Sequence, residues 1–526
     1  MAAAADYVIV GSRINGLTCA ALLGKRGKRV VVLEREGVAG GCMRSEAITA
    51  PGYLHDVLAT TFVLFITSPA FSKLGKDLQR HGLDFGHSVE PTGVLLPDGR
   101  ALVLSTDRAT TIARLNAVAA GQGDRYSADV AIVERDAELI FALLGGALWT
   151  RATAGLVLRE VWRRGPRGLA ARLGEALRSG RAWLETRYES DLVRALFAPW
   201  FLHAGLGPES ALAGEIGRVI AFALGAAGAP IVKGGAANVV RAFEALIREQ
   251  GGELRTGADV VEIVLASGKA RGVRLATGET ITATQGVICS VTPTQLYERL
   301  LPGPAVDQRL RERAAAFRCG KGNMQIHYAL KAPPRWRTPG LDKVALMHLT
   351  PGLDGVSKAV NECERGMLPA VPTICVGQPH ALDPSRCPEG AAILWIQLPE
   401  TPRTIKGDAA GEIATPADGV WSAEAREAYA DRVEAILASH VEGFRENVVA
   451  RRVYSPADLE AMNINLVGGD PYGGAYSLDQ SFLWRPFAES VNHVTAVPGL
   501  YHIGASTHPG PGLSGGSGHA LAERLR

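Results

Sequence analysis

The chain has 526 residues, which is more than one typical domain holds and predicts two or three domains. Hydrophobic residues make up 47% and charged residues 21%, a composition that excludes a disordered protein. The formal net charge of +3 is too small for a nucleic-acid-binding surface, so we expect no nucleic acid partner. The 7 cysteines are dispersed without metal-ligand spacing, which indicates reduced thiols, a cytoplasmic location and no metal site.

A nucleotide-binding pattern begins close to the N-terminus. Residues 7–10 predict a buried strand, residues 17–27 a helix, and residues 29–33 a second strand that ends before an acidic residue. A glycine-rich turn between the first strand and the helix offers backbone N–H groups to a pyrophosphate, and the acid accepts hydrogen bonds from ribose hydroxyls. The predicted cofactor contacts here are Gly11, Ser12, Arg13, Ile14, Asn15, Gly16, Glu34 and Arg35.

One residue departs from this pattern. Arg13 stands where the fingerprint G-x-G-x-x-G has its second glycine, which normally lets the backbone approach the pyrophosphate. The arginine can clash with the cofactor, turn outward, or place its guanidinium on a phosphate. The sequence leaves these three outcomes open.

A Gly-Gly segment follows at residues 37–45. An acidic strand end followed by Gly-Gly and a basic residue resembles the FAD-dependent phytoene (carotenoid) desaturase-like oxidoreductases, which are relatives of the flavin amine oxidases. The resemblance implies FAD as the cofactor. It also implies that this segment passes beside the pyrophosphate and the flavin, through Gly40, Gly41, Cys42 and Arg44.

Two later segments continue the resemblance. Residues 233–237 precede an amphipathic helix and three predicted strands, of which the first is at 260–264. The resemblance implies that Val261 in this strand contacts the adenine of the cofactor. Near the C-terminus, a strand at 500–504 enters a Gly/Pro-rich turn and a small-residue helix whose N-terminus is expected to face the flavin. This closing motif implies contacts from Gly504, Ala505, Pro511, Gly512, Leu513 and Ser514.

The resemblance implies an α/β fold. A discontinuous Rossmann-like FAD-binding domain, with a parallel sheet and a β-meander, is expected to carry an inserted α+β substrate domain. The FAD-binding parts are residues 1–75, 231–300 and 491–526, and the substrate parts are the helix-rich 76–230 and 301–490.

Residues 139–187 join an apolar run to a basic amphipathic segment. Nine arginines stand against three glutamates over 151–187. This pattern predicts peripheral contact with the inner, anionic face of a membrane. The alternative is a set of solvated helix faces whose arginine stems cover the core.

The resemblance implies an FAD-dependent oxidoreductase that desaturates or oxidises an apolar, polyene or lipid-like substrate by hydride transfer to flavin N5. His508 in the closing motif is the candidate catalytic base, with His203 as the alternative. A redox-neutral isomerase, an amine oxidase on the same fold, and a non-catalytic flavoprotein-like binding protein remain open, as do the electron acceptor and the oligomeric state.

Overall fold

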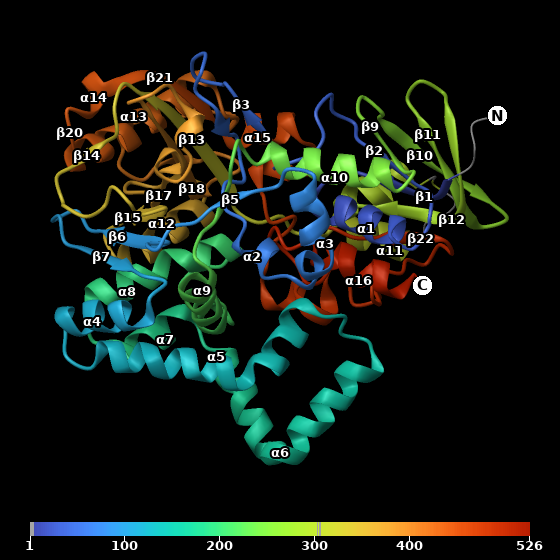
Figure 1. The fold of residues 1–526 in the computed structure, drawn as a ribbon, viewed down its shortest axis with the longest axis horizontal. Coiled ribbons are helices and arrows are strands. Elements are labelled where there is room, and N and C mark those ends of the chain that lie inside the picture. Colours follow the sequence, from blue (N-terminus) through green and yellow to red (C-terminus); the bar gives the residue numbers. More distant parts are fainter. Residues whose placement is uncertain (1–4, 302, 304–306, 526) are drawn as a thin grey trace.

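The computed structural model describes residues 5–301, 303 and 307–525, so the predicted domain ends at 1–4 and 526 lie outside the described part. Its first sheet has seven strands in the order β10-β11-β12-β1-β2-β9, with β22 paired to β12 (Figure 1). β1, β2, β9 and β22 join it in parallel, and β10–β12 form an antiparallel meander. The strands are β1 (Ala5–Val10), β2 (Val30–Leu33), β9 (Glu253–Arg255), β10 (Val260–Ala266), β11 (Lys269–Leu275), β12 (Thr280–Cys289) and β22 (Leu500–His502).

Both faces of this sheet are covered, which explains its nearly continuous apolar central strands. Ile9 of β1 packs into a cluster formed with the helices on one face, while Val8 and Val10 join the meander and the short π-helix Gln295–Leu300 on the other. The helices on the first face are α1 (Ile14–Gly24), α3 (Pro69–Arg80), α10 (Ala237–Glu249) and α16 (Gly516–Arg524); α11 (Gln308–Ala315) lies on the second. The predicted α/β fold with a parallel sheet and a β-meander is confirmed. The domain boundaries stay a prediction.

A second seven-stranded sheet has the order β21-β13-β18-β17-β15-β6-β7. One face packs against a helical cluster and the other against α13. The strands are β6 (Thr92–Leu95), β7 (Ala101–Leu104), β13 (Gly322–Leu330), β15 (Leu346–Leu349), β17 (Ile374–Gly377), β18 (Ala392–Thr401) and β21 (Val448–Tyr454). The helices around it are α4 (Arg108–Val118), α5 (Gln122–Gly145), α6 (Arg151–Ala176), α7 (Gly180–Arg187), α8 (Asp191–Phe197), α9 (Ala213–Ala227), α12 (Leu353–Glu364) and α13 (Ala423–His440).

Short elements connect these parts. They are β3 (Ser45–Glu46), β4 (His55–Asp56), β5 (Phe85–Gly86), β8 (Ile231–Val232), β14 (Arg335–Trp336), β16 (Met367–Leu368), β19 (Gly407–Asp408), β20 (Val441–Glu442), α2 (Val63–Ile66), α14 (Phe444–Asn447) and α15 (Pro456–Met462). A buried ion pair joins two of the connections. The fully buried Arg386 contacts Asp56 Oδ2 at 3.1 Å and Asp383 Oδ2 at 2.9 Å, and Asp56 also accepts the backbone N–H of Ala236. This network ties the start of α10 to the second sheet.

The helix α6 forms an arm that projects away from the two sheets, whereas α5 packs against α4 and α9 (Figure 1). α6 bends at Gly165, whose φ is +72°, and at Pro166, which cannot continue the backbone hydrogen bonding. Seven of the nine arginines over 151–187 form ion pairs, namely Arg159, Arg163, Arg164, Arg172, Arg178, Arg181 and Arg187. Much of the predicted basic charge is therefore neutralised within the chain.

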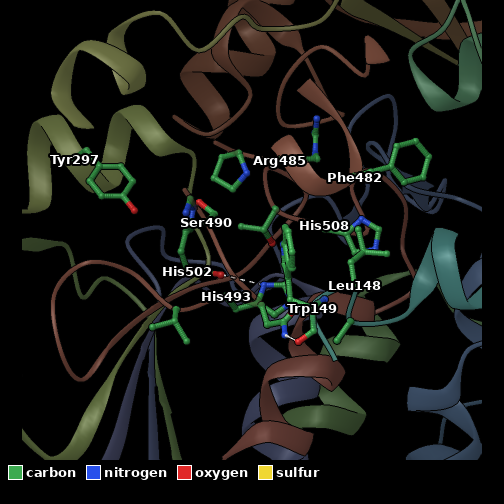
Figure 2. A pocket seen from close by; sticks show the side chains of 14 residues that line it. Leu148, Trp149, Tyr297, Phe482, Arg485, Ser490, His493, His502 and His508 are labelled. Atoms are coloured by element: carbon green, nitrogen blue, oxygen red, sulfur yellow. Dashed lines mark hydrogen bonds between the residues drawn. The ribbon is translucent and has the colours of Figure 1, made fainter. Parts of the chain in front are cut away.

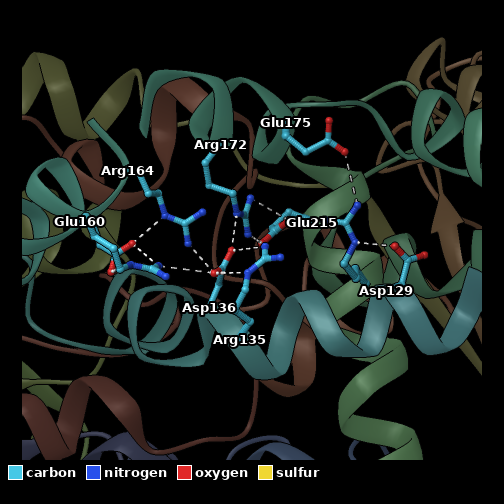
Figure 3. Close-up of polar contacts among 10 residues, drawn as sticks. Asp129, Arg135, Asp136, Glu160, Arg164, Arg172, Glu175 and Glu215 are labelled. Atoms are coloured by element: carbon cyan, nitrogen blue, oxygen red, sulfur yellow. Dashed lines mark hydrogen bonds and ion pairs between the residues drawn. The ribbon is translucent and has the colours of Figure 1, made fainter. Parts of the chain in front are cut away.

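Asp136 on α5 is the centre of this neutralisation (Figure 3). Its carboxylate is 0% exposed and accepts hydrogen bonds from Arg135, Arg164 and Arg172. Burial alone would raise the pKa of Asp136, but the three guanidinium groups outweigh burial and lower it below its ordinary range. Arg172 also reaches Glu215, so the network joins the arm to α9.

No helix in the described part of the chain combines the length and the apolar character that crossing a bilayer requires.

We expect Asp136→Asn to lower the free energy of unfolding by about 3 kcal/mol, because it leaves guanidinium groups without their buried counter-charge. The folded-state pKa of Asp136 is depressed, so its contribution is present above the unfolded pKa of about 4 and is lost as the pH falls below it. Urea unfolding of both proteins at several pH values measures this difference. The matched control is Glu138→Gln in the exposed pair with Arg159, for which we expect a change of less than about 0.5 kcal/mol. Equal effects of the two substitutions would contradict the role of Asp136.

Candidate functional site

Two cavities meet at the turn between β1 and α1. The smaller, about 50 Å³, lies at the carboxyl ends of β1 and β2 and reaches residues 258–260, 290–291 and 463–465. The larger, about 280 Å³, extends from the same turn toward the second sheet and α9. Arg13 and no other described residue is common to both linings. The carboxyl edge of a parallel sheet is the usual position of a nucleotide site in such folds.

The turn itself depends on two glycines. Gly11 has a φ of +96°, and a Cβ there would stand 2.9 Å from the carbonyl oxygen of Ser290. A Cβ at Gly16 would clash with the carbonyl oxygen of Gly11, so only glycine lets α1 begin this close to the sheet. The structure has the predicted glycine-rich turn, and α1 begins at Ile14, three residues before the predicted helix, and ends at Gly24.

Ser12 connects the turn to two other segments. Its hydroxyl donates to Glu34 Oε2 at 2.5 Å and accepts the backbone N–H of Gly40 at 2.8 Å. The second carboxylate oxygen of Glu34 accepts the backbone N–H of Glu36 at 3.1 Å. Glu34 is thus held facing the smaller cavity, where a carboxylate with remaining lone pairs can accept hydrogen bonds from a ribose.

The side chain of Arg13 turns inward. It lies along Gly41, where a Cβ would stand 2.7 Å from Arg13 Cγ. Its Nη2 is buried, and within the described part of the chain it has no hydrogen-bond partner. Of the three outcomes that the sequence leaves open, the structure excludes the outward one.

The larger cavity has two unlike ends. One end is formed by predicted cofactor contacts, namely Arg13, Ile14, Asn15, Gly40, Cys42, Ala505, Gly512 and Leu513. The other is mostly apolar, with side chains such as Leu58, Val219, Ile220, Leu224, Leu346, Trp200 and Trp395. Polar groups there are neutral: Asn323, Gln325, Gln397, Tyr472 and His203. Among the described residues that line this cavity, none is Asp or Glu.

Other predicted cofactor contacts lie outside both linings. Arg44 pairs with Glu46 at 2.5 Å. The backbone N–H of Gly504 donates to Ser517 Oγ at 2.9 Å, and Ser514 Oγ accepts the N–H of Gly516 at 3.1 Å, so both support the start of α16. Val261 follows Val260, which lines the smaller cavity, and Pro511 precedes Gly512, which lines the larger. Gly11, Glu34, Arg35 and Gly41 line the smaller cavity as expected.

His508 lies in a different place from the one predicted for a catalytic base. It borders a separate cavity of about 30 Å³ together with Phe482, Arg485 and His493 (Figure 2). Its Nε2 donates to the carbonyl oxygen of Gly146 at 2.9 Å, and burial lowers its pKa to about 4. His508 therefore braces the closing turn against the end of α5, and this geometry does not support its role as the base.

His203 does face the larger cavity, from the short 3-10 helix Ala198–Ala204. Its Nε2 is 2.9 Å from His348 Nε2, and burial lowers the pKa of His203 to about 4 and that of His348 well below its ordinary value. Both rings are therefore neutral near pH 7. Cys375, paired with His348 across β15 and β17, completes a group whose ligand atoms lie within 4.8 Å of one another. Such a group has the ligand types that zinc or copper prefers.

Sequence reasoning identified His203 and missed His348 and Cys375. The three residues are far apart in the chain, and their meeting depends on the register of β15 with β17 and on the fold of residues 198–204. No local spacing could have indicated it.

Comparison with known proteins gives one family across nearly the whole chain. The family described as "Flavin containing amine oxidoreductase" matches residues 14–512. The mouse "Pyridine nucleotide-disulfide oxidoreductase domain-containing protein 2" is 26% identical over 98% of this chain and 92% of its own length. The "zeta-carotene-forming phytoene desaturase" of Myxococcus xanthus is 25% identical over 96% of this chain and 90% of its own.

A solved structure shares the fold. Wild-type putrescine oxidase bound to putrescine aligns with a TM-score of 0.61 and 15% identity, over 99% of this chain and 98% of that one. The resemblance to desaturase-like oxidoreductases and flavin amine oxidases is thereby confirmed.

Proposed function

The chain belongs to the flavin-containing amine oxidoreductase family, and we propose that it is an FAD-dependent enzyme that desaturates an apolar substrate by hydride transfer to the flavin. The observation that carries this proposal is the larger cavity, which joins the nucleotide-binding turn at one end to an apolar, carboxylate-free chamber at the other. A flavin cofactor and oxidoreductase chemistry follow from the family. The dinucleotide form and the substrate class are proposed.

The donors and acceptors of the turn fit FAD. Glu34 faces the smaller cavity as a ribose acceptor, and the N-terminus of α1 offers backbone N–H groups to a pyrophosphate. α16 begins beside α1, where Gly518 donates its N–H to Asn15 Oδ1 at 3.3 Å. Two helix N-termini thus converge near one end of the larger cavity, where their positive ends favour negative charge on a reduced cofactor.

The lining of the larger cavity favours an apolar substrate over an amine. A protonated amine that leaves water needs an anionic or strongly polar partner. No carboxylate stands among the described lining residues, and the charged group there is the cation of Arg13. Apolar side chains instead gain stability by excluding water from a hydrocarbon. Phytoene desaturase, as its name states, is a relative that acts on such a substrate.

His203, which lines the larger cavity, is the proposed acceptor of the proton that accompanies hydride loss. When a hydride leaves one carbon, the adjacent C–H becomes strongly acidic, so a weak, neutral base suffices. Bound FAD supplies the two-electron acceptor in this chemistry. The Nε2–Nε2 contact with His348 orients the His203 ring, and burial keeps both rings neutral. In the tautomer in which His203 Nε2–H donates to His348 Nε2, the lone pair of His203 Nδ1 accepts the proton.

The exposed apolar side chains of the arm form a candidate membrane contact. Leu158 is 68% exposed and Trp162, one turn later on the same face of α6, is 90% exposed. Arg159 and Arg163 flank Trp162 with half-exposed side chains that pair with Glu138 and Glu160, so the candidate contact depends chiefly on the apolar side chains. An exposed aromatic and aliphatic face suits insertion into the headgroup region of a bilayer, from which an apolar substrate would be delivered.

Anaerobic flavin reduction tests the proposed activity. We expect the FAD-loaded protein to lose its flavin absorbance when it is mixed with partly saturated polyene or terpenoid hydrocarbons in detergent, and to stay oxidised with aliphatic mono- and diamines. Mass spectrometry of the product should show the loss of two hydrogens. A product of unchanged mass would replace desaturation with isomerisation, and reduction by amines alone would contradict the apolar substrate.

His203→Gln should slow flavin reduction by roughly 100-fold or more while flavin content stays unchanged, because glutamine fills the site without accepting a proton. The rate for the unaltered enzyme should be constant near neutral pH and fall as the pH approaches about 4. His508→Gln is the comparison variant and should keep most of the rate. A slow His508 variant beside a fast His203 variant would reverse the assignment.

Co-sedimentation with vesicles tests the arm. We expect binding to phosphatidylglycerol vesicles at low salt, and Trp162→Ser should weaken it by roughly tenfold, since it removes a large apolar group from the contact. Val89→Ser, which changes an exposed valine elsewhere, should have no effect. Absence of the unaltered protein from the pellet at every salt concentration would exclude this surface.

A further inference from the structure

We propose that Arg13 is an anion-binding residue of the cofactor site, whose guanidinium pairs with the pyrophosphate of FAD in place of the backbone approach that glycine normally provides. This inference rests on the proposed FAD cofactor and concerns how this chain binds it.

Arg13 lies at the point where the two cavities meet. In the proposed binding mode the adenosine half of the dinucleotide lies beside Glu34 at the smaller cavity, and the flavin half lies in the larger cavity. A pyrophosphate that joins the two halves has to pass where the cavities meet. Arg13 lines both cavities, and it is also the residue that precedes the first turn of α1. Its side chain and the helix N-terminus therefore present positive charge at the same point.

The second argument for this role of Arg13 is the charge balance of the site. Three arginines line the two cavities. Arg35 pairs with Glu36 and Arg299 with Asp259, each at 2.6 Å. For Arg13, by contrast, the described residues provide no carboxylate partner, and its Nη2 is buried without a hydrogen bond. A buried guanidinium atom without a partner is costly, and a phosphate oxygen satisfies its N–H groups and its charge together.

Gly41 leaves room for the arginine side chain. The Arg13 side chain runs across Gly41, and a Cβ on that residue would overlap Cγ at 2.7 Å. Gly41 also has a φ of +61°, which an L side chain rarely adopts. The absence of a side chain at Gly41 therefore provides the space along which the Arg13 side chain reaches both cavities.

Flavin binding to apoprotein, followed by flavin fluorescence, tests this inference without measuring turnover. We expect Arg13→Gly and Arg13→Gln to raise the dissociation constant for FAD by about 10- to 100-fold, with Arg13→Lys in between. Riboflavin lacks phosphate, so its affinity should be the same for all these proteins. Added salt should weaken FAD binding by the unaltered chain more than by Arg13→Gly.

Arg248→Gln is the matched control, because Arg248 lies outside the linings of both cavities and is already paired with Glu244. It should change FAD affinity by less than about fivefold. Equal or tighter FAD binding by Arg13→Gly would overturn the inference, as would an equal loss of riboflavin affinity, which would indicate general damage. Failure of the unaltered chain to bind FAD would instead overturn the proposed function.

Discussion

Close backbone contact at the start of α1 is the constraint on which both cavities depend. Gly16 allows the helix to begin against the carbonyl of Gly11, and Gly11 in turn lies against Ser290 at the end of β12. Ser12 then uses one hydroxyl group to hold Glu34 and the backbone of Gly40. The turn, the acidic strand end and the Gly-Gly segment are therefore arranged around one point, from which one cavity extends along the sheet and the other toward the substrate region.

Buried guanidinium atoms have two kinds of surroundings in this protein, with and without a carboxylate partner. In the arm and between the sheets, guanidinium groups meet carboxylates within the chain, as Arg172 meets Asp136 and Arg386 meets Asp56. These pairs join helices and connections that are distant in sequence. At the junction of the cavities, Arg13 has no such partner among the described residues. The cost of a buried guanidinium atom without a partner is the basis of the proposal that Arg13 binds an anionic ligand.

The apolar chamber and its neutral histidines have a common cause. Removing water lowers the pKa of His203 and His348, and it also makes the chamber unfavourable for a charged substrate that has no counter-ion. An environment of this kind holds a hydrocarbon and keeps a base uncharged at neutral pH. The proposed substrate class and the proposed proton acceptor thus rest on one physical property of the cavity.

The amino-acid sequence by itself determined the nucleotide-binding part. The strand at 7–10, the turn with Gly11 and Gly16, the meander after 260 and the closing strand at 500 each depend on local periodicity or on a glycine that the backbone requires, and such features can be read within a short window. Only the tertiary structure decided the direction of Arg13, because the space it enters is cleared by Gly41 on another segment. It also placed His508 against Gly146, brought His203 to His348, and neutralised the arginines of α6 with Asp136. The position of each of these side chains depends on a segment that is distant in the sequence and packs against it. A pattern of neighbouring residues cannot indicate which segment that is.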